Sequence, residues 1–462
     1  MIKTKPSIPK GTRDFTPAEM YRRNFIFNTI REVFEIYGYM PIETPAIENL
    51  TTLLGKYGEE GDRLLFKILN SGDYLSKVKE KDFQEKKLNE VTGSISEKGL
   101  RYDLTVPFAR FVVQNRNDLT FPFKRYQVQP VWRADKPQKG RYREFYQCDV
   151  DVIGSDSLLN EVELILIIEE VFKRLNINVN IRLNNRKILS GIAEYMDESL
   201  KFTDITVAID KLDKIGADGV TRELKDKGIS PEGIQKLQPF LEFDGDLEQR
   251  LGFLSEKLKD SEMGMKGVEE FLAIHRYLKD LGKEDLCELD LTLARGLNYY
   301  TGSIIEVNAG DMKIGSICGG GRYDDLTGIF GLPDVSGVGI SFGADRIYDV
   351  MNNLGLFPGG SAVSTEVLLI NFGGEEEKFA LQKSANLRLK GVKAELYPEP
   401  AKLKKQMKYA DQKSIPYVVM AGSEEIKKGF LTVKNMQSGE QDKVKSDDLS
   451  EFILEKLIHQ PK

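Results

Sequence analysis

A loop rich in arginine and lysine is the segment of this sequence with the clearest capacity for chemistry. Five cationic side chains lie between Arg133 and Arg143, and Pro137 and Gly140 turn the loop. Phe145 follows and offers a flat aromatic face close by. A guanidinium fork binds phosphate through paired hydrogen bonds, and a ring can stack on a base. The loop is therefore a candidate nucleotide-binding site, although a cation cluster on a hairpin is most often only a solvated surface.

Two further tracts combine glycine, arginine and tyrosine. In "ARGLNYYTGSIIEV", Arg295 precedes the adjacent Tyr299 and Tyr300, which would point to opposite faces if they lie on a strand. In "SICGGGRYDD", three glycines precede Tyr323. They predict either a tight turn or a backbone held against a ligand where no side chain would fit.

A third group of residues has the polar atoms that an amino group needs. Asp103 and Thr105 are two residues apart on a predicted strand over 101–105, so they share one face. Gln147 and Asp151 are four apart on a second predicted strand and share a face too. Carboxylates and the amide oxygen accept hydrogen bonds, so this second pair could bind an ammonium group.

Several familiar types of site are disfavoured. Neither a GxxxxGK[ST] loop nor a GxGxxG that opens a helix occurs. Ser341 stands in a GxSxG tract, as in many hydrolases, but the two histidines, His275 and His459, do not follow the usual serine, acid, histidine order. We therefore interpret that tract as a strand-to-helix turn leading to Arg346.

The elements that would hold these residues indicate an α+β fold. Strand patterns at 125–132 and 144–153 bracket the cationic loop, and helical patterns dominate 181–285. From residue 364 strands and helices alternate, which is typical of a separate α/β domain. We predict a main domain formed by 1–180 and 286–355, a mostly helical insertion at 181–285, and a C-terminal domain at 364–462.

Composition restricts the partners and the cellular compartment that we expect for this protein. The net charge is −6, so the protein as a whole is not basic. If it binds a nucleic acid, a local basic patch must contact the phosphates. No segment has the roughly 20 apolar residues that span a membrane, and the N-terminus lacks an apolar signal region. The three cysteines are widely spaced, which fits a reducing cytoplasm.

Five stretches together resemble one known family. "GYMPIETPAIE", "RADKPQKGRYREF" and "GISFGADR" resemble the three motifs of class II aminoacyl-tRNA synthetases. "LARGLNYYTG" and "GGGRYDDL" resemble signatures of the histidyl-tRNA synthetase family, as does the opening "KGTRDFTP". The resemblance covers nearly the whole chain. It implies a class II synthetase-type antiparallel sheet flanked by helices, with a helical insertion and a C-terminal anticodon-binding α/β domain.

The resemblance also assigns roles to residues. For ATP it implies Arg133 on the α-phosphate, Phe145 stacked on adenine, Arg346 on the γ-phosphate, and Arg141 nearby. Arg295 would be the signature catalytic arginine, acting with Arg133. Histidine would be bound by Asp103, Thr105, Gln147, Asp151, Tyr299, Tyr300 and Tyr323. Lys136, Gln138 and Lys139 would contact tRNA. At Asn298 the family usually has an acidic residue, which puts an electrostatic role for that position in doubt.

The activity so implied is ligation of L-histidine to tRNA(His), with ATP and Mg²⁺, by a cytoplasmic homodimer that does not enter membranes. Positioned arginines and Mg²⁺ suit a reaction that rearranges charge on phosphate oxygens, and no histidine base is required. The main alternative is a non-catalytic, synthetase-like regulatory subunit of histidine biosynthesis. Proteins of that kind typically lack the anticodon-binding domain and lose motif residues.

Overall fold

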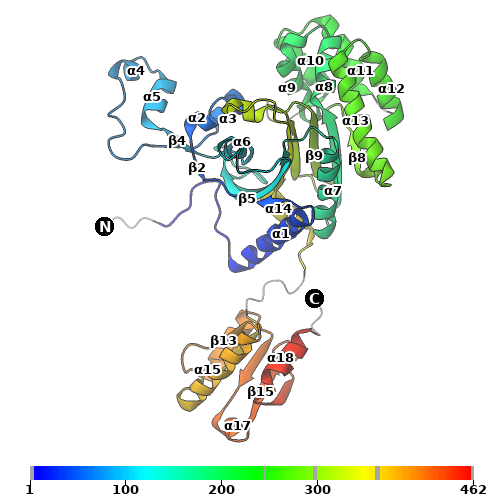
Figure 1. Cartoon of the computed structure of the whole chain (residues 1–462). Coiled ribbons are helices and arrows are strands. Elements are labelled where there is room, and N and C mark those ends of the chain that lie inside the picture. Colours follow the sequence, from blue (N-terminus) through cyan, green and yellow to red (C-terminus); the bar gives the residue numbers. More distant parts are fainter. Residues whose placement is uncertain (1–4, 244, 295–298, 359–364, 459–462) are drawn as a thin grey trace. The chain divides into compact units, whose positions relative to one another are not determined.

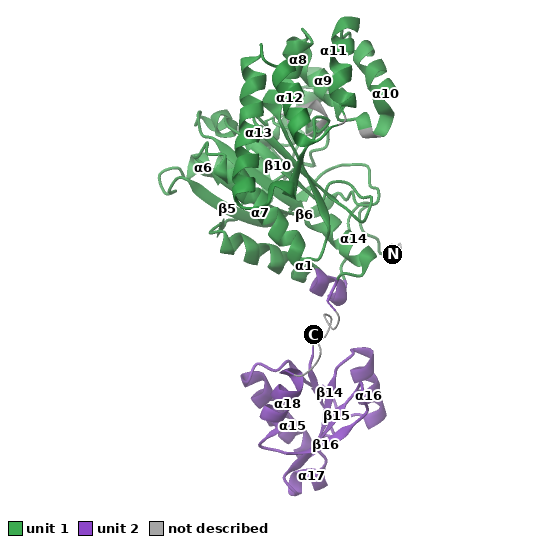
Figure 2. Cartoon of the chain, turned by 90° about the vertical axis from the view of Figure 1, so that its right-hand side faces the viewer, with its two compact units in different colours: residues 1–15, 23–356 green, residues 16–22, 357–462 purple. Residues whose placement is uncertain are grey.

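The computed structural model describes residues 5–243, 245–294, 299–358 and 365–458. The chain forms two compact units, the first of residues 1–15 and 23–356 and the second of residues 16–22 and 357–462 (Figure 2). Each unit has its own main β-sheet.

An eight-stranded sheet is the centre of the first unit. Its order is β1-β5-β6-β11-β10-β9-β7-β8. The strands are β1 Met40–Pro41, β5 Phe123–Trp132, β6 Glu144–Ile153, β7 Val179–Asn185, β8 Cys287–Leu289, β9 Ser303–Ala309, β10 Cys318–Tyr323 and β11 Gly337–Gly343. All neighbours are antiparallel except the edge pairs β1–β5 and β7–β8. The predicted antiparallel sheet is therefore confirmed.

The helices α1 Pro17–Ile36, α7 Leu159–Arg174 and α14 Ala344–Leu354 pack near this sheet (Figure 1). The backbone amide of Thr16 donates to Glu19 Oε2 at 2.7 Å, which begins α1 with a capping interaction. Along α7, Ile165 and Ile168 are fully buried, and Phe172 lies 5.6 Å from the Phe342 ring of β11. This burial on one side leaves the other face of the sheet for polar residues.

The described helices between β7 and β8 form the upper part of Figure 1. The α-helices among them are α8 Arg186–Tyr195, α9 Phe202–Ile209, α10 Leu212–Asp226, α11 Pro231–Glu242, α12 Leu247–Lys257 and α13 Glu262–Asp280. α8 and α13 approach closely at a pair of glycines, because a Cβ on Gly191 would lie 2.5 Å from the Cα of Gly264. The predicted helical character of this segment is confirmed.

The segment before β5 departs from prediction. It holds a three-stranded sheet and short helices: β2 Ile47–Asn49, α2 Leu50–Leu53, α3 Gly58–Arg63, β3 Lys67–Ile68, α4 Glu80–Gln84, α5 Leu88–Ile95, β4 Lys98–Leu100 and α6 Thr105–Gln114. The strand predicted over 101–105 is wrong, since β4 ends at Leu100 and α6 begins at Thr105. The apolar residues that follow Thr105 serve a buried helix instead. Short 3₁₀ helices complete the unit: η1 Ser199–Lys201, η2 Glu284–Leu286 and η3 Leu326–Phe330.

The second unit contains a five-stranded mixed sheet in the order β13-β12-β14-β15-β16. Its elements are β12 Val367–Leu369, α15 Gly374–Leu389, β13 Ala394–Leu396, α16 Leu403–Gln412, β14 Tyr417–Met420, α17 Ser423–Lys427, β15 Phe430–Asn435, β16 Gln441–Lys445 and α18 Leu449–Ile458. Val367, Leu387, Val419 and Ile453 are among its buried core residues. The predicted alternation of strands and helices is confirmed.

Candidate functional site

A cavity of about 650 Å³ lies in the first unit, near the cationic loop, where β6 and β10 begin and β11 ends. This volume is in the range of small-molecule sites. Five of the predicted site residues line it: Arg133, Arg141, Phe145, Gln147 and Arg346. The tertiary structure thus brings together two sequence tracts that are about 200 residues apart, and a hydrogen bond from Arg346 to the Gly140 carbonyl joins them directly.

Arg133 follows directly after β5 and is held in a fixed orientation. Its Nε donates to the Tyr102 carbonyl at 3.0 Å, and its guanidinium lies 4.2 Å from the Tyr102 ring and 5.2 Å from the Phe145 ring. Among the described residues its terminal nitrogens have no hydrogen-bond partner. They can therefore bind a phosphate oxygen beside an aromatic face.

Arg346 comes from the first turn of α14 and closes the loop side of the cavity. Its Nε donates to the Gly140 carbonyl at 2.8 Å and its Nη1 to the Ser316 carbonyl at 2.6 Å. These two bonds fix the guanidinium at the cavity wall.

The remaining loop residues are more exposed. Arg141 Nη1 lies 3.6 Å from Asp135 Oδ1, and the Arg141 side chain is half-exposed. Three other loop residues, Lys136, Gln138 and Lys139, are exposed.

One face of β6 carries Gln147, Asp149 and Asp151, all buried. Gln147 Nε2 donates to the Ser341 hydroxyl at 2.7 Å. Asp151 accepts a hydrogen bond from the Tyr323 hydroxyl and pairs with Arg125 at 2.8 Å. The prediction that Gln147 and Asp151 share a strand face is confirmed. Asp149 was missed, although the same period of two would have found it.

Two acceptor atoms on this face, Gln147 Oε1 and Asp149 Oδ1, have neither a hydrogen-bond partner nor an ion pair among the described residues. A buried acceptor left unpaired costs about 1–3 kcal/mol. A ligand with N–H donors, such as an amino acid, would satisfy both. The geometry therefore supports an amine-binding region where β6 reaches the cavity.

Asp103 forms a second carboxylate cluster. It accepts hydrogen bonds from the Tyr57 hydroxyl and the Val106 amide, both at 3.1 Å, and from the Tyr299 hydroxyl at 3.4 Å. Burial raises the pKa of the Asp103 carboxyl. Tyr57 also lines the cavity, so Asp103 adjoins it without lining it. Thr105 is the first residue of α6, so the shared strand face predicted for it and Asp103 is wrong.

The tyrosines lie around these carboxylates. Tyr299 and Tyr300 precede β9, so they do not lie on a strand and the opposite-face geometry considered for a strand does not apply to them. Their ring centres are 5.1 Å apart, and Tyr323 lies 6.2 Å from Tyr299. The three glycines before Tyr323 are in β10 and do not make a tight turn. A Cβ on Gly321 would lie 3.1 Å from the Tyr300 ring, so glycine lets that ring approach the strand.

Some predicted residues lie outside the described part of the chain, and others have a structural role. Arg295 and Asn298 lie outside the described residues, as does His459. Ser341 is within β11 and its hydroxyl accepts from Gln147, which gives no support to a hydrolase elbow. The cavity is also lined by residues that the sequence pattern did not reveal, namely Tyr57, Tyr102, Arg186, Thr203 and Thr206.

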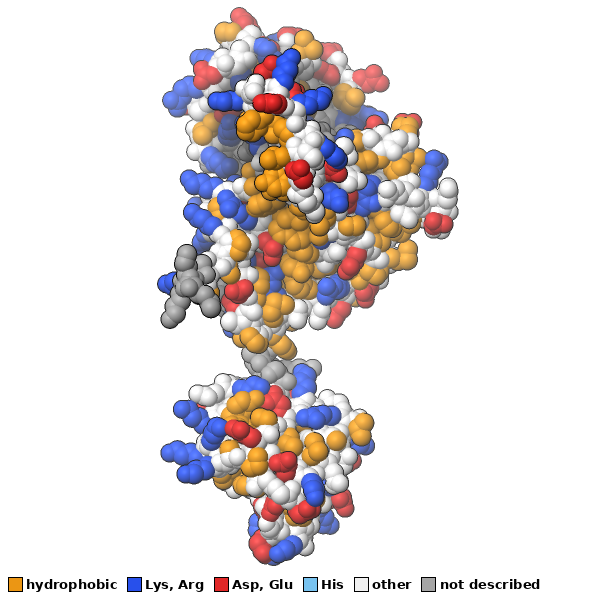
Figure 3. Space-filling model, turned by 90° about the vertical axis from the view of Figure 1, so that its left-hand side faces the viewer, with side chains coloured by type: hydrophobic (Ala, Val, Ile, Leu, Met, Phe, Trp, Pro, Cys, Tyr) orange, Lys and Arg blue, Asp and Glu red, His pale blue; other side chains and the backbone are white. Residues whose placement is uncertain are grey.

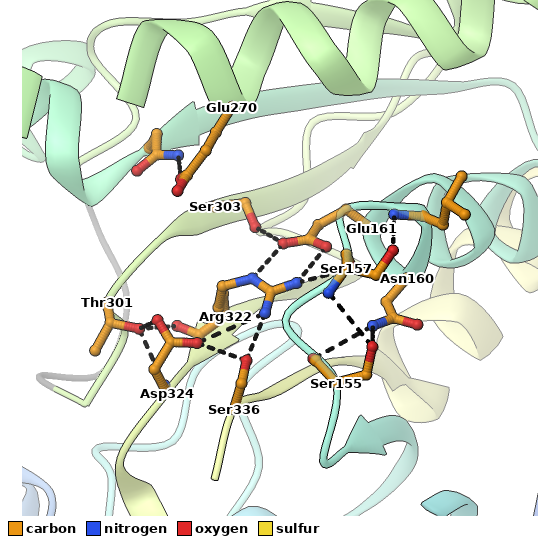
Figure 4. Close-up of polar contacts among 12 residues, drawn as sticks. Ser155, Ser157, Asn160, Glu161, Glu270, Thr301, Ser303, Arg322, Asp324 and Ser336 are labelled. Carbon is orange, nitrogen blue, oxygen red and sulfur yellow. Dashed lines mark hydrogen bonds and ion pairs between the residues drawn. The ribbon is translucent and has the colours of Figure 1, made fainter. Parts of the chain in front are cut away.

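A buried ion pair supports the strand that carries Tyr323 (Figure 4). Arg322 Nε and Nη2 each donate to the Glu161 carboxylate at 2.6 Å. The Ser303 hydroxyl also donates to Glu161, and Arg322 Nη1 donates to the Ser336 hydroxyl. Both charged side chains are almost completely buried, at 4% and 0% exposed. The pair therefore fixes β10 against α7 next to the tyrosine cluster.

Arginines beside an aromatic ring, next to a buried acidic strand face in a largely antiparallel sheet, are the arrangement expected of an aminoacyl-tRNA synthetase. The family model for histidyl-tRNA synthetase matches residues 11–80 and 73–347, and an anticodon-binding-domain model matches 366–456. The chain belongs to the histidyl-tRNA synthetase family.

Individual relatives support the same family membership. The chain is 59% identical to a histidine–tRNA ligase of Bacteroides fragilis (strain YCH46), over 96% of this chain and 98% of the relative. It is 59% identical to the histidine–tRNA ligase of Porphyromonas gingivalis over the same shares. A crystal structure of histidyl-tRNA synthetase from Nostoc sp. PCC 7120 aligns with a TM-score of 0.82 at 34% identity, covering 98% of this chain and 100% of that one.

The buried carboxyl of Asp149 predicts a pH effect on stability. Burial raises its pKa to about 7, while the Arg125 guanidinium opposes the rise and Asp151 adds to it. The unfolded chain releases this proton near pH 4, so stability is lost as pH rises above about 4 and the loss is complete above about 7. Between about pH 5 and 8 the free energy of unfolding should therefore fall in the wild type. We expect this fall to be roughly 2–3 kcal/mol smaller in Asp149→Asn.

Thermal unfolding at both pH values measures this difference. Asp118→Asn, at an exposed aspartate, is the matched control and should follow the wild type. Parallel pH profiles for wild type and Asp149→Asn would contradict the prediction.

Proposed function

We propose that this chain activates L-histidine with ATP to histidyl-adenylate and transfers the histidyl group to the 3′ end of tRNA(His). The observation that carries the proposal is the cavity in which Arg133, Phe145 and Arg346 adjoin the unpaired acceptors of the β6 face. The near full-length histidine–tRNA ligase relatives and the anticodon-binding-domain match favour this activity over the regulatory alternative.

In the first step the histidine carboxylate attacks the α-phosphorus of ATP and pyrophosphate leaves. Arg133 would hold the α-phosphate, and Arg346 and Arg141 the outer phosphates, while Phe145 stacks on adenine. These cations stabilise the charge that moves onto the phosphate oxygens. Arg295 would act as a catalytic arginine, as its motif implies.

The amino acid would lie between the β6 face and the Asp103 cluster. Gln147 and the carboxylates of Asp103 and Asp151, with Thr105, would bind the ammonium group, and the unpaired Asp149 oxygen would add an acceptor. Tyr299, Tyr300 and Tyr323 would shape the imidazole pocket. A pocket that bonds both ring nitrogens can reject non-bonding analogues by roughly 10⁴–10⁵.

Mg²⁺ would accompany ATP. No cluster of three or more histidine, cysteine, aspartate or glutamate side chains suited to a metal occurs among the described residues. That fits Mg²⁺, which is usually held by one or two carboxylates together with phosphates and water. Asp135 and Asp210 line the cavity and offer such oxygens. The ion would neutralise charge on the phosphates.

The wider assembly is part of the proposal. Lys136, Gln138 and Lys139 on the exposed loop would contact the tRNA. Residues 364–462 would form the anticodon-binding domain, and residues 181–285 would form the helical insertion in the catalytic domain.

We also propose a cytoplasmic homodimer. Figure 3 shows a broad hydrophobic area on the first unit, and a partner subunit would cover apolar surface of this kind. Ile47, Leu54 and Leu69 are exposed apolar residues of the same unit. No helix in the described ranges is long and apolar enough to cross a membrane.

Histidine-dependent ATP–pyrophosphate exchange tests the activation step directly. We expect exchange with histidine and with no other amino acid. A folded protein without exchange for any amino acid would favour the regulatory alternative.

Truncation separates the two units. We expect a chain that ends at about residue 362 to keep histidine-dependent exchange largely intact, because every residue lining the cavity lies in the first unit. Charging of tRNA should fall strongly, since the anticodon-binding domain is gone. Steady-state exchange and aminoacylation measure both effects. Loss of exchange in the truncated chain would show that the proposed domain boundary is wrong.

A further inference from the structure

One wall of the cavity is formed by the helices between β7 and β8. It carries Arg186, at the start of α8, and a face of α9 with Thr203, Thr206 and Val207. The three α9 positions recur at helical spacing, so they share one side of the helix. No sequence motif includes this wall, and neither ATP nor histidine needs its residues in the proposed reaction.

Arg186 differs from the other cations near the junction of β7 and α8. Arg182 pairs with Asp290 and Glu306, and Lys187 pairs with Glu270. Across the described ranges Arg186 has no carboxylate partner and no side-chain hydrogen bond; its guanidinium lies 4.8 Å from the Phe202 ring. A ring fixes the guanidinium and leaves its N–H groups to a ligand.

The cost of burial points to an anionic ligand. Arg186 is partly buried, and burial alone lowers its pKa. A cation removed from water without a counter-ion is unfavourable. An arginine that is stacked on a ring, lines a cavity and has no carboxylate is therefore arranged for an anion that arrives with the substrate.

We propose that Arg186 binds a backbone phosphate at the 3′ end of the tRNA and so positions the terminal adenosine for transfer. The phosphates of ATP already have Arg133, Arg141 and Arg346 on the loop wall. Thr203 offers a hydroxyl on the same wall, and hydroxyl and arginine side chains are both typical contacts for a nucleic-acid backbone. The inference rests on the proposed function, because it assumes that the cavity receives the tRNA end.

The test is Arg186→Gln in the full-length chain, with Arg186→Lys as the charge-conserving variant. We expect Arg186→Gln to keep histidine-dependent exchange within about 2-fold, and to raise the KM for tRNA or slow single-turnover transfer by about 10-fold to 100-fold, as the loss of a charged hydrogen bond does. Arg186→Lys should recover part of the loss. Arg276→Gln, at an exposed arginine of α13, is the matched control.

Salt dependence separates a phosphate contact from a structural effect. Loss of one single-strand phosphate contact should reduce the slope of log affinity against log salt by about 0.7. Weaker ATP binding together with weaker exchange would assign the anion to ATP and overturn the proposal. Unchanged transfer, or slower transfer with an unchanged slope, would overturn it too. If the wild type lacked exchange altogether, the proposed function would fail first and separately.

Discussion

Replacement of Arg133 by alanine should slow histidyl-adenylate formation by roughly 10²–10³-fold, as removal of one transition-state donor can. The Arg133 guanidinium is held by the Tyr102 carbonyl and by the rings of Tyr102 and Phe145, so its position is set before ATP arrives. Alanine removes both the charge and the fork. Arg133→Lys should recover only part of the rate, because an ammonium cannot bind phosphate through two parallel hydrogen bonds.

Single-turnover formation of the adenylate measures the effect without tRNA. Arg143→Ala is the matched control, since Arg143 is in the same loop and its Nε also donates to a backbone carbonyl, that of Asp135, but it does not line the cavity. We expect this control to stay within about 10-fold of wild type. Equal losses for the two variants would mean that the loop structure, and not the Arg133 charge, limits activation.

Replacement of Arg322 by methionine should lower the free energy of unfolding of the first unit by about 3–5 kcal/mol. Glu161 is completely buried and accepts two hydrogen bonds from Arg322, so the variant leaves a buried carboxylate with only the Ser303 hydroxyl (Figure 4). The double variant Arg322→Met with Glu161→Gln removes that uncompensated charge. The double variant should therefore regain a substantial part of the free energy of unfolding that Arg322→Met loses.

Thermal unfolding of the full chain measures this effect. Arg174→Met is the control, because its pairs with Glu170 and Glu32 are partly exposed and such pairs contribute about 0–1 kcal/mol. If Arg322→Met unfolded at the same temperature as Arg174→Met, the buried pair would not be a main support of β10. A double variant no more stable than Arg322→Met would contradict the role given to the leftover charge.

The sequence by itself determined those features that depend on local pattern. A period of two predicted the shared face of Gln147 and Asp151 on β6. The motifs predicted which arginines and aromatic residue would share one cavity, and Arg133, Phe145 and Arg346 do. Such features depend on residues that are close in the chain or on tracts repeated throughout a family.

Local pattern failed where burial decided the backbone. Asp103 and Thr105 were predicted to share a strand, yet Thr105 begins a helix whose apolar face is buried, and Asp103 is fixed by Tyr57, from a tract with no recognisable motif. Tyr299 and Tyr300, which would point to opposite faces if they were on a strand, lie before β9 begins. In each case packing against distant residues outweighed the local preference.

Only the tertiary structure decided which charges would be neutralised and which left for a ligand. The residue type alone does not show that Arg322 is paired with a glutamate 161 positions earlier, while Arg186 stacks on a ring and lines the cavity. The unpaired oxygens of Gln147 and Asp149 are likewise a result of which strands lie side by side. Pairing and burial depend on contacts between residues far apart in the chain, and the residue types alone do not specify them.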